Sequence, residues 1–119
     1  MVFDETEIRM AERRMVAALE SDDRFAWVAE YTDDAVFDAG EPVRGREALL
    51  EMAAHMTPLR DVSITPLHTE GSGDRAAVWC EATWTSGPED ARREVQMRGI
   101  LVWRREPDGV WRVAIEHLA

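Results

Sequence analysis

The sequence predicts an α+β domain in which three N-terminal helices pack in a curved, mostly antiparallel β-sheet. In the first half, apolar residues mostly recur at helical spacing, and from Leu59 they recur with a period of two. The chain has 119 residues, enough for one domain with a substantial core and too few for two of ordinary size. Because the helices precede the strands, we expect residues 1–119 to form a single domain with helices on one face of the sheet.

Two helices are expected before residue 35. Asp4 and Glu7 resemble a capping box that opens the first helix. The apolar residues that follow at helical spacing are Ile8, Ala11, Met15, Ala18 and Leu19. The segment "SDD" at 21–23 can end this helix and cap a short second one, in which Trp27 and Tyr31 lie one turn apart. The second helix is therefore expected to end near "TDD" at 32–34.

A brief strand and a third helix complete the first half. The segment "AVFDAG" at 35–40 is short, β-prone and stopped by Gly40, which indicates a strand. In "VRGREALLEMAAHMTP" at 43–58, Leu49, Met52 and Met56 restore the helical period before Pro58 breaks it.

Four strands are expected in the second half. They are "DVSITPLHTE" (61–70), "RAAVWCEATWT" (75–85), "REVQMRGILVWRRE" (93–106) and "VWRVAIEHL" (110–118). The connecting segments "GSGD", "SGPED" and "PDG" have the composition of turns and loops. The strands should therefore form an antiparallel meander.

Alternation along these strands predicts which face is buried. The core face should carry Val78, Cys80, Ala82 and Trp84 from one strand and Met97, Gly99, Leu101 and Trp103 from the next. In the last strand, hydrophobicity favours a buried set of Trp111, Val113, Ile115 and His117. That assignment would place Glu116 outside.

The other face of the sheet is also partly apolar, which favours the opposite assignment. Trp79, Ile100 and Val102 would stand in water unless something covers them. We therefore expect a homodimer through this outer sheet face, with Trp111, Val113 and Ile115 as candidate interface residues. On this interpretation Glu116 faces the interior. The sequence leaves open whether Glu116 or His117 does so.

Charge and composition exclude several classes of partner. A formal charge of −10 and a pI near 4.7 disfavour nucleic acid and anionic membranes. The N-terminal residues lack the pattern of a signal peptide, and the single cysteine suits a reducing compartment, so we expect a cytoplasmic protein. The three histidines share no ligand spacing, which predicts no metal site. "GSG" at 71–73 is a hairpin loop, so no nucleotide cofactor is expected.

Two long segments carry a resemblance to a known family. "MVAALESDDRFAWVAEYTDDAVFDAGEPVRGREALLEM" and "RGILVWRREPDGVWRVAIEHLA" resemble the nuclear transport factor 2-like superfamily, including its SnoaL-like and ketosteroid isomerase-like branches. The pieces that carry the resemblance are "YTDDAVF", "VRGREAL" and "DGVWRVAIEH", in that order. The resemblance implies a cone-shaped fold, in which a curved sheet wraps around the helices and leaves a pocket at the open end.

The ketosteroid isomerase branch can be compared position by position. Its oxyanion-hole tyrosine corresponds to Met15, its catalytic aspartate to Ala39, and its second oxyanion-hole acid to Leu101 or Ile100. A reaction that needs a base and two hydrogen-bond donors cannot proceed with these side chains. Steroid isomerisation is therefore excluded, unless a one-residue shift beside Gly40 turns Asp38 inward.

Other branches place an acid in the pocket seven residues after the last turn glycine. Counting seven from Gly109 gives Glu116. SnoaL-like cyclases and limonene epoxide hydrolase use such an acid, and the hydrolase pairs it with an Arg-x-Asp motif. The nearest match here is "WCE" at 79–81, which lacks the arginine, so epoxide opening is disfavoured. The resemblance implies a lone carboxylate in an apolar cone.

These observations select the candidate site residues. Glu116 is the expected acid or base, because burial among apolar side chains would raise its pKa. Tyr31 matches a pocket-edge position of the isomerases and could donate a hydrogen bond to a ligand or to Glu116, and Asp38 is the third candidate. The expected ligand-binding residues are Met15, Trp27, Met52, Met56, Cys80, Trp84, Met97, Leu101 and Trp103. The alternatives are a surface or interface role for Glu116 and a packed core tyrosine at position 31.

Two functions remain open. The first is a pocket protein that binds a small apolar molecule and catalyses cofactor-independent proton transfer, cyclisation or hydration with Glu116. The second is a non-catalytic binding or dimeric assembly module of the same fold. A hollow cone would favour the first function, and a collapsed one the second.

Overall fold

A computed structural model describes residues 3–119, and all element counts below refer to these residues. The helices are α1 (Glu5–Glu20), α2 (Arg24–Val28) and α3 (Arg46–Ala54). The strands are β1 (Tyr31–Asp38), β2 (Pro42–Arg44), β3 (Arg60–Ser72), β4 (Arg75–Ser86), β5 (Arg93–Arg105) and β6 (Trp111–Leu118).

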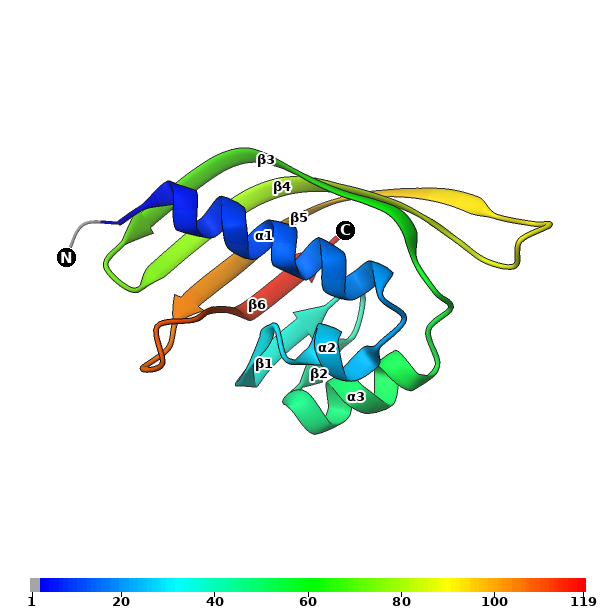
Figure 1. The fold of residues 1–119 in the computed structure, drawn as a ribbon, viewed down its shortest axis with the longest axis horizontal. Coiled ribbons are helices and arrows are strands. Elements are labelled where there is room, and N and C mark those ends of the chain that lie inside the picture. Colours follow the sequence, from blue (N-terminus) through cyan, green and yellow to red (C-terminus); the bar gives the residue numbers. More distant parts are fainter. Residues whose placement is uncertain (1–2) are drawn as a thin grey trace.

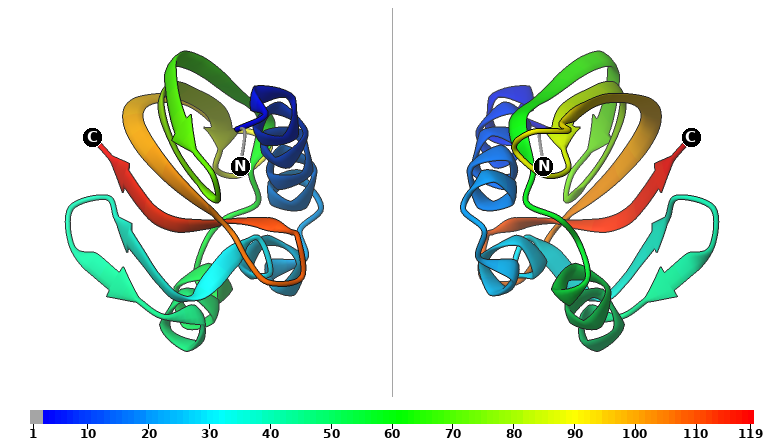
Figure 2. Two further views of the ribbon diagram at one scale, coloured as in Figure 1. Left: turned by 90° about the vertical axis from the view of Figure 1, so that its left-hand side faces the viewer. Right: turned by 90° about the vertical axis from the view of Figure 1, so that its right-hand side faces the viewer.

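One six-stranded sheet, in the order β2-β1-β6-β5-β4-β3, curves around the helices. Figure 1 shows α1 lying over the sheet, and Figure 2 shows the curvature of the sheet from both ends of the molecule. Strands β3 to β6 pair antiparallel in chain order, and β1 pairs parallel with β6. The expected α+β class, with three helices packed in a mostly antiparallel sheet, is confirmed.

Helix α1 begins where the sequence predicts, but its first turn is held differently. The Asp4 carboxylate accepts a hydrogen bond from the Thr6 backbone N–H at 2.9 Å. The Glu7 side chain does not close a capping box, because its Oε2 accepts a hydrogen bond from the Trp111 indole Nε1 at 2.7 Å. Glu7 therefore ties α1 to β6.

The second helix is shorter than expected, and Tyr31 begins a strand rather than ending a helix. Asp23 caps α2 by accepting bonds from the N–H groups of Phe25 and Ala26, and the helix ends at Val28. From Tyr31 the chain runs parallel to β6, and the Val113 N–H donates to the Glu30 carbonyl at 2.8 Å. This long-range pairing overrides the local helical spacing.

The segment expected to begin the third helix instead contains a strand. Val43 lies in β2, which pairs antiparallel with β1 and forms the sheet edge. Gly45, with φ of +85°, joins β2 to α3 and donates its N–H to the Ala35 carbonyl at 2.8 Å. Helix α3 ends at Ala54, four residues before Pro58.

The predicted core face of the long strands agrees with their burial. Val78, Cys80, Leu101 and Trp103 are buried, and they form one cluster with apolar residues of all three helices. On the opposite face, Trp79 remains partly exposed. The helices therefore cover only one side of the sheet.

The last strand follows neither of the two alternation patterns derived from the sequence. Trp111 and Val113 are buried, Ile115 is exposed, and Glu116 and Leu118 are buried. The register with β5 shifts at this point, because Trp103 pairs with Val113 whereas Val102 pairs with Ile115. The extra residue, Ala114, forms a β-bulge that exchanges the faces of the strand.

This bulge corrects the expected sheet interface. Trp111 is 4% exposed and Val113 is fully buried within the single chain, so neither is available to a partner. Ile115 is 46% exposed on the outer face. His117 is also on that face, with its Nδ1 3.9 Å from the Asp38 carboxylate.

Candidate functional site

An apolar cavity lies between the helices and the concave face of the sheet. Its volume is about 130 Å³. Helices α1 and α2, strands β1 and β3 to β6, and the segment after α3 all contribute to its lining. Glu116 is its one charged lining residue among those that the structure describes.

The bulge at Ala114 is what turns Glu116 into this cavity. Upstream of the bulge, Val113 faces the core, and a regular strand would place residue 115 on the same face. The extra residue moves the inward positions to Glu116 and Leu118, both of which line the cavity. The feature that resolves the alternative between Glu116 and His117 is therefore a local change of register.

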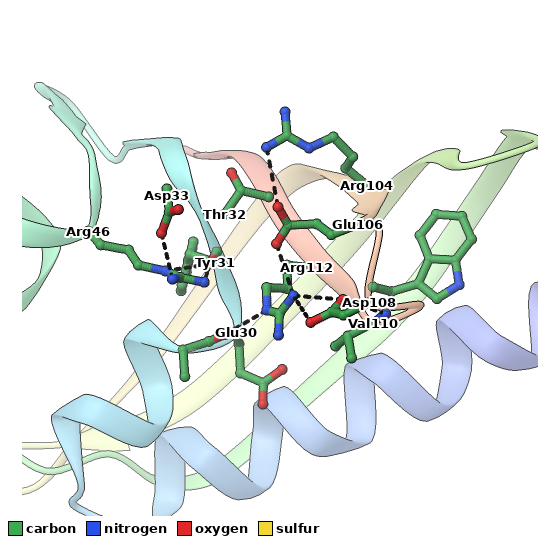
Figure 3. Close-up of polar contacts among 12 residues, drawn as sticks. Glu30, Tyr31, Thr32, Asp33, Arg46, Arg104, Glu106, Asp108, Val110 and Arg112 are labelled. Atoms are coloured by element: carbon green, nitrogen blue, oxygen red, sulfur yellow. Dashed lines mark hydrogen bonds and ion pairs between the residues drawn. The ribbon is translucent and has the colours of Figure 1, made fainter.

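A second irregularity, in β1, positions Tyr31 opposite Glu116. Tyr31 pairs with Val113 and Val36 pairs with Ile115, so residues 32–35 bow out of the ladder between β1 and β6. Arg46 donates two hydrogen bonds to the Tyr31 carbonyl, from Nε at 2.9 Å and from Nη2 at 2.6 Å. Its Nη1 also bonds the Asp33 carboxylate at 2.6 Å, as Figure 3 shows. Arg46 thus fixes the backbone from which Tyr31 projects.

Charged pairs brace the same region from the helix side. Arg14 on α1 donates to both oxygens of the Glu30 carboxylate, at 3.0 and 2.7 Å, and to the Trp111 carbonyl at 2.7 Å. Arg112 bonds Glu106 at 3.0 Å, so the turn before β6 is held as well (Figure 3). The start of β1 and the start of β6 are therefore tied together beside the site.

Tyr31 and Glu116 form a buried hydrogen-bonded pair. The Tyr31 hydroxyl donates to Glu116 Oε1 at 2.6 Å. Tyr31 is 1% exposed and Glu116 is 8% exposed. Among the residues described, Tyr31 is the side chain that donates a hydrogen bond to the Glu116 carboxyl group. Because Glu116 lines the cavity, its carboxyl group can interact with a ligand there.

Burial gives this pair unusual acidities. Desolvation raises the pKa of Glu116 from its ordinary value of 4.5 to about 7, and the hydrogen bond from Tyr31 opposes part of that rise. Desolvation and the nearby Glu116 carboxylate hold the pKa of Tyr31 well above its usual value. Glu116 can therefore exchange a proton near neutral pH, while Tyr31 keeps its proton and remains a hydrogen-bond donor.

Trp27 and Cys80 complete the polar surroundings of the pair. The Trp27 and Tyr31 rings meet edge to face, with centroids 5.3 Å apart. Burial, followed by the charges of Glu116 and Glu12, raises the pKa of the Cys80 thiol to about 11. The thiol therefore stays protonated at neutral pH and is a poor nucleophile.

Glu12 on α1 is a further buried acid that was not predicted from the sequence. It is 5% exposed, and its Oε1 lies 3.0 Å from Arg9 Nη1. Burial raises its pKa, and the Arg9 charge opposes that rise. Glu12 does not line the Glu116 cavity, so its role differs from that of Glu116.

The structure brings together most of the residues predicted to bind a ligand. Those that line the cavity are Met15, Trp27, Met56, Cys80, Trp84, Met97 and Leu101. Two of the predicted residues lie outside it: Trp103 is fully buried in the core, and Met52 packs against the core from α3. Asp38 is also outside, where its Oδ1 accepts a hydrogen bond from the Gly40 N–H at 3.0 Å. Asp38 therefore does not turn into the cavity.

Several lining residues were not predicted. They are Leu19, Phe37, Ala39, Leu59, Val62, Ile64, Ala82 and Leu118. Strand alternation could have found Val62 and Ile64, because they share one face of β3. Phe37 could not be found in this way, because its orientation depends on the irregular pairing of β1.

The three positions that correspond to the ketosteroid isomerase residues meet in this cavity. Met15, Ala39 and Leu101 all line it. None of these side chains can transfer a proton or donate a hydrogen bond to an enolate oxygen. The acid of this cavity comes instead from β6.

The fold and the site define a class of small α+β domain, in which a curved sheet encloses an apolar cavity whose lining contains one buried acid. The chain belongs to the SnoaL-like domain family, whose model matches residues 13–114. None of the curated proteins matches the chain.

Solved structures share the fold over nearly the whole chain. Rv3472 of Mycobacterium tuberculosis, a protein of unknown function, is 25% identical with a TM-score of 0.84, covering 97% of this chain and 74% of that one. A ketosteroid isomerase-like protein from Erwinia carotovora is 23% identical, with a TM-score of 0.80 and coverage of 98% and 96%. A nuclear transport factor 2-like protein with a cystatin-like fold, from Novosphingobium aromaticivorans, is 20% identical, with a TM-score of 0.80 and coverage of 98% and 80%. These likenesses confirm the expected fold.

Neither a membrane-spanning helix nor a metal-binding cluster occurs within residues 3–119. Within this range no helix has both the length and the apolar character needed to cross a bilayer. Within the same range no three His, Cys, Asp or Glu side chains are grouped so that they could hold a metal ion.

Proposed function

We propose that the protein binds a small apolar molecule in the Glu116 cavity and catalyses a proton transfer without a cofactor. The observation that carries this proposal is the isolation of Glu116, a buried carboxyl with a pKa raised to about 7, in an otherwise apolar lining. A group with this pKa is present in both protonation states at neutral pH, so it can accept a proton and return it.

The proposed step uses only the side chains of the cavity. The Glu116 carboxylate takes a proton from a carbon next to a ligand carbonyl. The C–H electron pair becomes the C=C bond of an enolate, the carbonyl π pair moves to its oxygen, and the protonated Glu116 is the hydrogen-bond donor for that oxygen. The protonated Glu116 then returns the proton to the ligand at carbon or oxygen, which restores the carboxylate. Tyr31, which donates to Oε1 at 2.6 Å, holds the carboxyl group in place during the cycle. Cyclisation and hydration would use the same acid and base.

Deuterium exchange into a small ketone tests this proposal. With phenylacetone in D2O, followed by NMR, the wild-type protein should accelerate exchange next to the carbonyl, and the rate should rise through a pH of about 7 as Glu116 ionises. Glu116→Gln should lower the protein-dependent rate by about a hundredfold, because general acid–base catalysis contributes roughly this much or more.

Asp38→Asn is the matched control for this experiment. It removes a carboxylate at the end of β1, outside the cavity, and should leave exchange unchanged. Equal exchange in the wild type and in Glu116→Gln, with phenylacetone shown to bind, would favour the non-catalytic binding function instead.

We also propose that the outer sheet face pairs two copies of the chain. Trp79 pairs with Ile100, and Val102 pairs with Ile115, so these four residues form an apolar patch across β4, β5 and β6. Charges of both signs surround the patch, including Arg98 and Glu81 at 3.7 Å. A second copy related by a two-fold axis could bury the apolar patch and pair with these charges.

Ile115→Asp should weaken this dimer by about tenfold or more, because it places a charge within the patch, at its exposed β6 residue. Sedimentation velocity at micromolar concentrations measures the change. Leu67→Asp is the control, since Leu67 is 55% exposed on the edge strand β3 and lies outside the patch. A wild-type protein that sediments only as a monomer would contradict the proposed dimer.

A further inference from the structure

A second, smaller cavity adjoins the one that holds Glu116. It has a volume of about 90 Å³ and lies between α1, α2 and the segment that follows α3. The two cavities share Leu19, Trp27, Met56 and Leu59 in their linings. The two cavities therefore adjoin each other at these four apolar side chains.

A third hollow continues from the second cavity towards the surface. It shares Ala53, Met56 and Arg24 with the second cavity and lies between α2 and α3. Met56 lines all three spaces, and its side chain is partly exposed. The three spaces thus form a series that runs from Glu116 to the outside of the molecule.

The chemical character of the lining changes along this series. The innermost cavity is apolar except for Glu116, whereas Asp22, Asp23 and Arg24 line the second. The two acids have other partners: Asp22 forms a double hydrogen bond with Arg60, at 2.8 Å on each oxygen, and Asp23 caps α2. The inner end of the series therefore suits an apolar group, and the outer end suits a hydrated one.

The volumes limit the shape of the ligand. An apolar cavity of about 150 Å³ accommodates benzene, so a cavity of about 130 Å³ accommodates a group of about one ring. A rigid plate of several fused rings would exceed this volume. A flexible chain, by contrast, could extend past Met56 into the second cavity.

We infer that the protein binds an elongated apolar molecule, with a single-ring or similarly small head beside Glu116 and a chain that lies in the second cavity. This inference rests on the proposed function for the identity of the reacting end. It adds the size of the head, the direction in which the chain leaves the site and the route of entry between α2 and α3.

A series of para-alkylphenols tests the inference by calorimetry and by tryptophan fluorescence, since Trp27 lines both cavities. Affinity should rise from phenol to para-ethylphenol to para-pentylphenol, by about threefold to fourfold for each methylene that becomes buried. An affinity that does not increase with chain length would contradict the inference.

Ala53→Phe provides the discriminating variant. Ala53 lines the second cavity and the outer hollow, but not the Glu116 cavity, so the larger side chain should fill the space proposed for the chain. Para-pentylphenol should then bind about tenfold more weakly, and phenol should bind within about twofold of the wild type. Ala54→Phe, which alters only the outer hollow, should change neither affinity.

A second variant and two further outcomes complete the test. If Ala53→Phe fails to fold in a thermal melt, Ala18→Leu fills the second cavity from α1 and should give the same selective loss. An equal loss for phenol and para-pentylphenol would overturn the inference. The chain-length series repeated in Glu116→Gln separates the two proposals, because chain-dependent binding should persist there even if Glu116 proves to have no role in proton exchange.

Discussion

The difference in the free energy of unfolding between Glu116→Gln and the wild type should shift in favour of Glu116→Gln by about 3 kcal/mol from pH 4 to pH 8. Glu116 has a pKa of about 7 in the native protein, whereas its ordinary value of 4.5 applies in the unfolded chain. Between these two values the native state binds a proton that the unfolded state has released. The free energy of unfolding contributed by Glu116 therefore falls as the pH rises through this window. Glutamine carries no charge to desolvate and removes this dependence.

Urea denaturation of both proteins at several pH values between 4 and 8 measures the effect. The difference between the two proteins is the relevant quantity, because other groups titrate in the opposite direction. Asp34, for example, has its pKa lowered to about 2, chiefly by its hydrogen bond with Arg104. Glu51→Gln, on the exposed side of α3, is the matched control and should follow the wild type.

In Tyr31→Phe, the loss of stability that accompanies ionisation of Glu116 should occur at higher pH than in the wild type. The Tyr31 hydroxyl donates to Glu116 and thereby stabilises the carboxylate, so its removal should raise the pKa of Glu116 further. If the wild type and Glu116→Gln kept a constant stability difference from pH 4 to pH 8, Glu116 would not be a buried, uncompensated acid, and the basis of the proposed function would be lost.

The order and type of most elements could be predicted because they depend on local patterns. Strand alternation identified the buried faces of β4 and β5, and the caps at Asp4 and Asp23 marked the starts of two helices. The start of β1 could not be predicted, because Tyr31 follows a helical pattern locally and becomes a strand only through parallel pairing with β6. Such a partner lies more than 80 residues away in the sequence.

The candidate site was harder to predict because two irregularities create it. Regular alternation places Val113 and Glu116 on opposite faces of the strand, so only one of them could be buried. In the structure both are buried, because Ala114 is an extra residue in β6. The sequence around Ala114 contains no glycine or proline that would signal a bulge. The count of seven residues from Gly109 indicated Glu116 only through the family resemblance. A count taken from the family already includes an extra residue at a bulge.

Gly99→Ala should destabilise the protein by about 3 kcal/mol and displace the end of β6 that carries Glu116. Gly99 lies on the core face of β5, between Cys80 on β4 and Leu118 on β6. A Cβ at this position would lie 2.6 Å from Leu118 Cδ2 and closer still to the His117 carbonyl oxygen. Because part of the obstacle is backbone, the strand itself must move, and β6 cannot relax without shifting Glu116 and Leu118.

Gly71→Ala separates this close approach from the general effect of adding a methyl group to a strand glycine. Neither glycine has a positive φ, and the three atoms nearest to a Cβ at position 71 all belong to the Phe3 ring, at 2.5 to 2.6 Å, a side chain that can move as a whole without displacing a strand. We expect this control to change stability by less than about 1 kcal/mol. Denaturant unfolding measures both variants, and phenol affinity at pH 7 reports the cavity. A loss of affinity in Gly99→Ala under native conditions, with none in Gly71→Ala, is the expected result. Equal stability and affinity in the two variants would show that the end of β6 can move freely, so that Gly99 does not fix the position of Glu116.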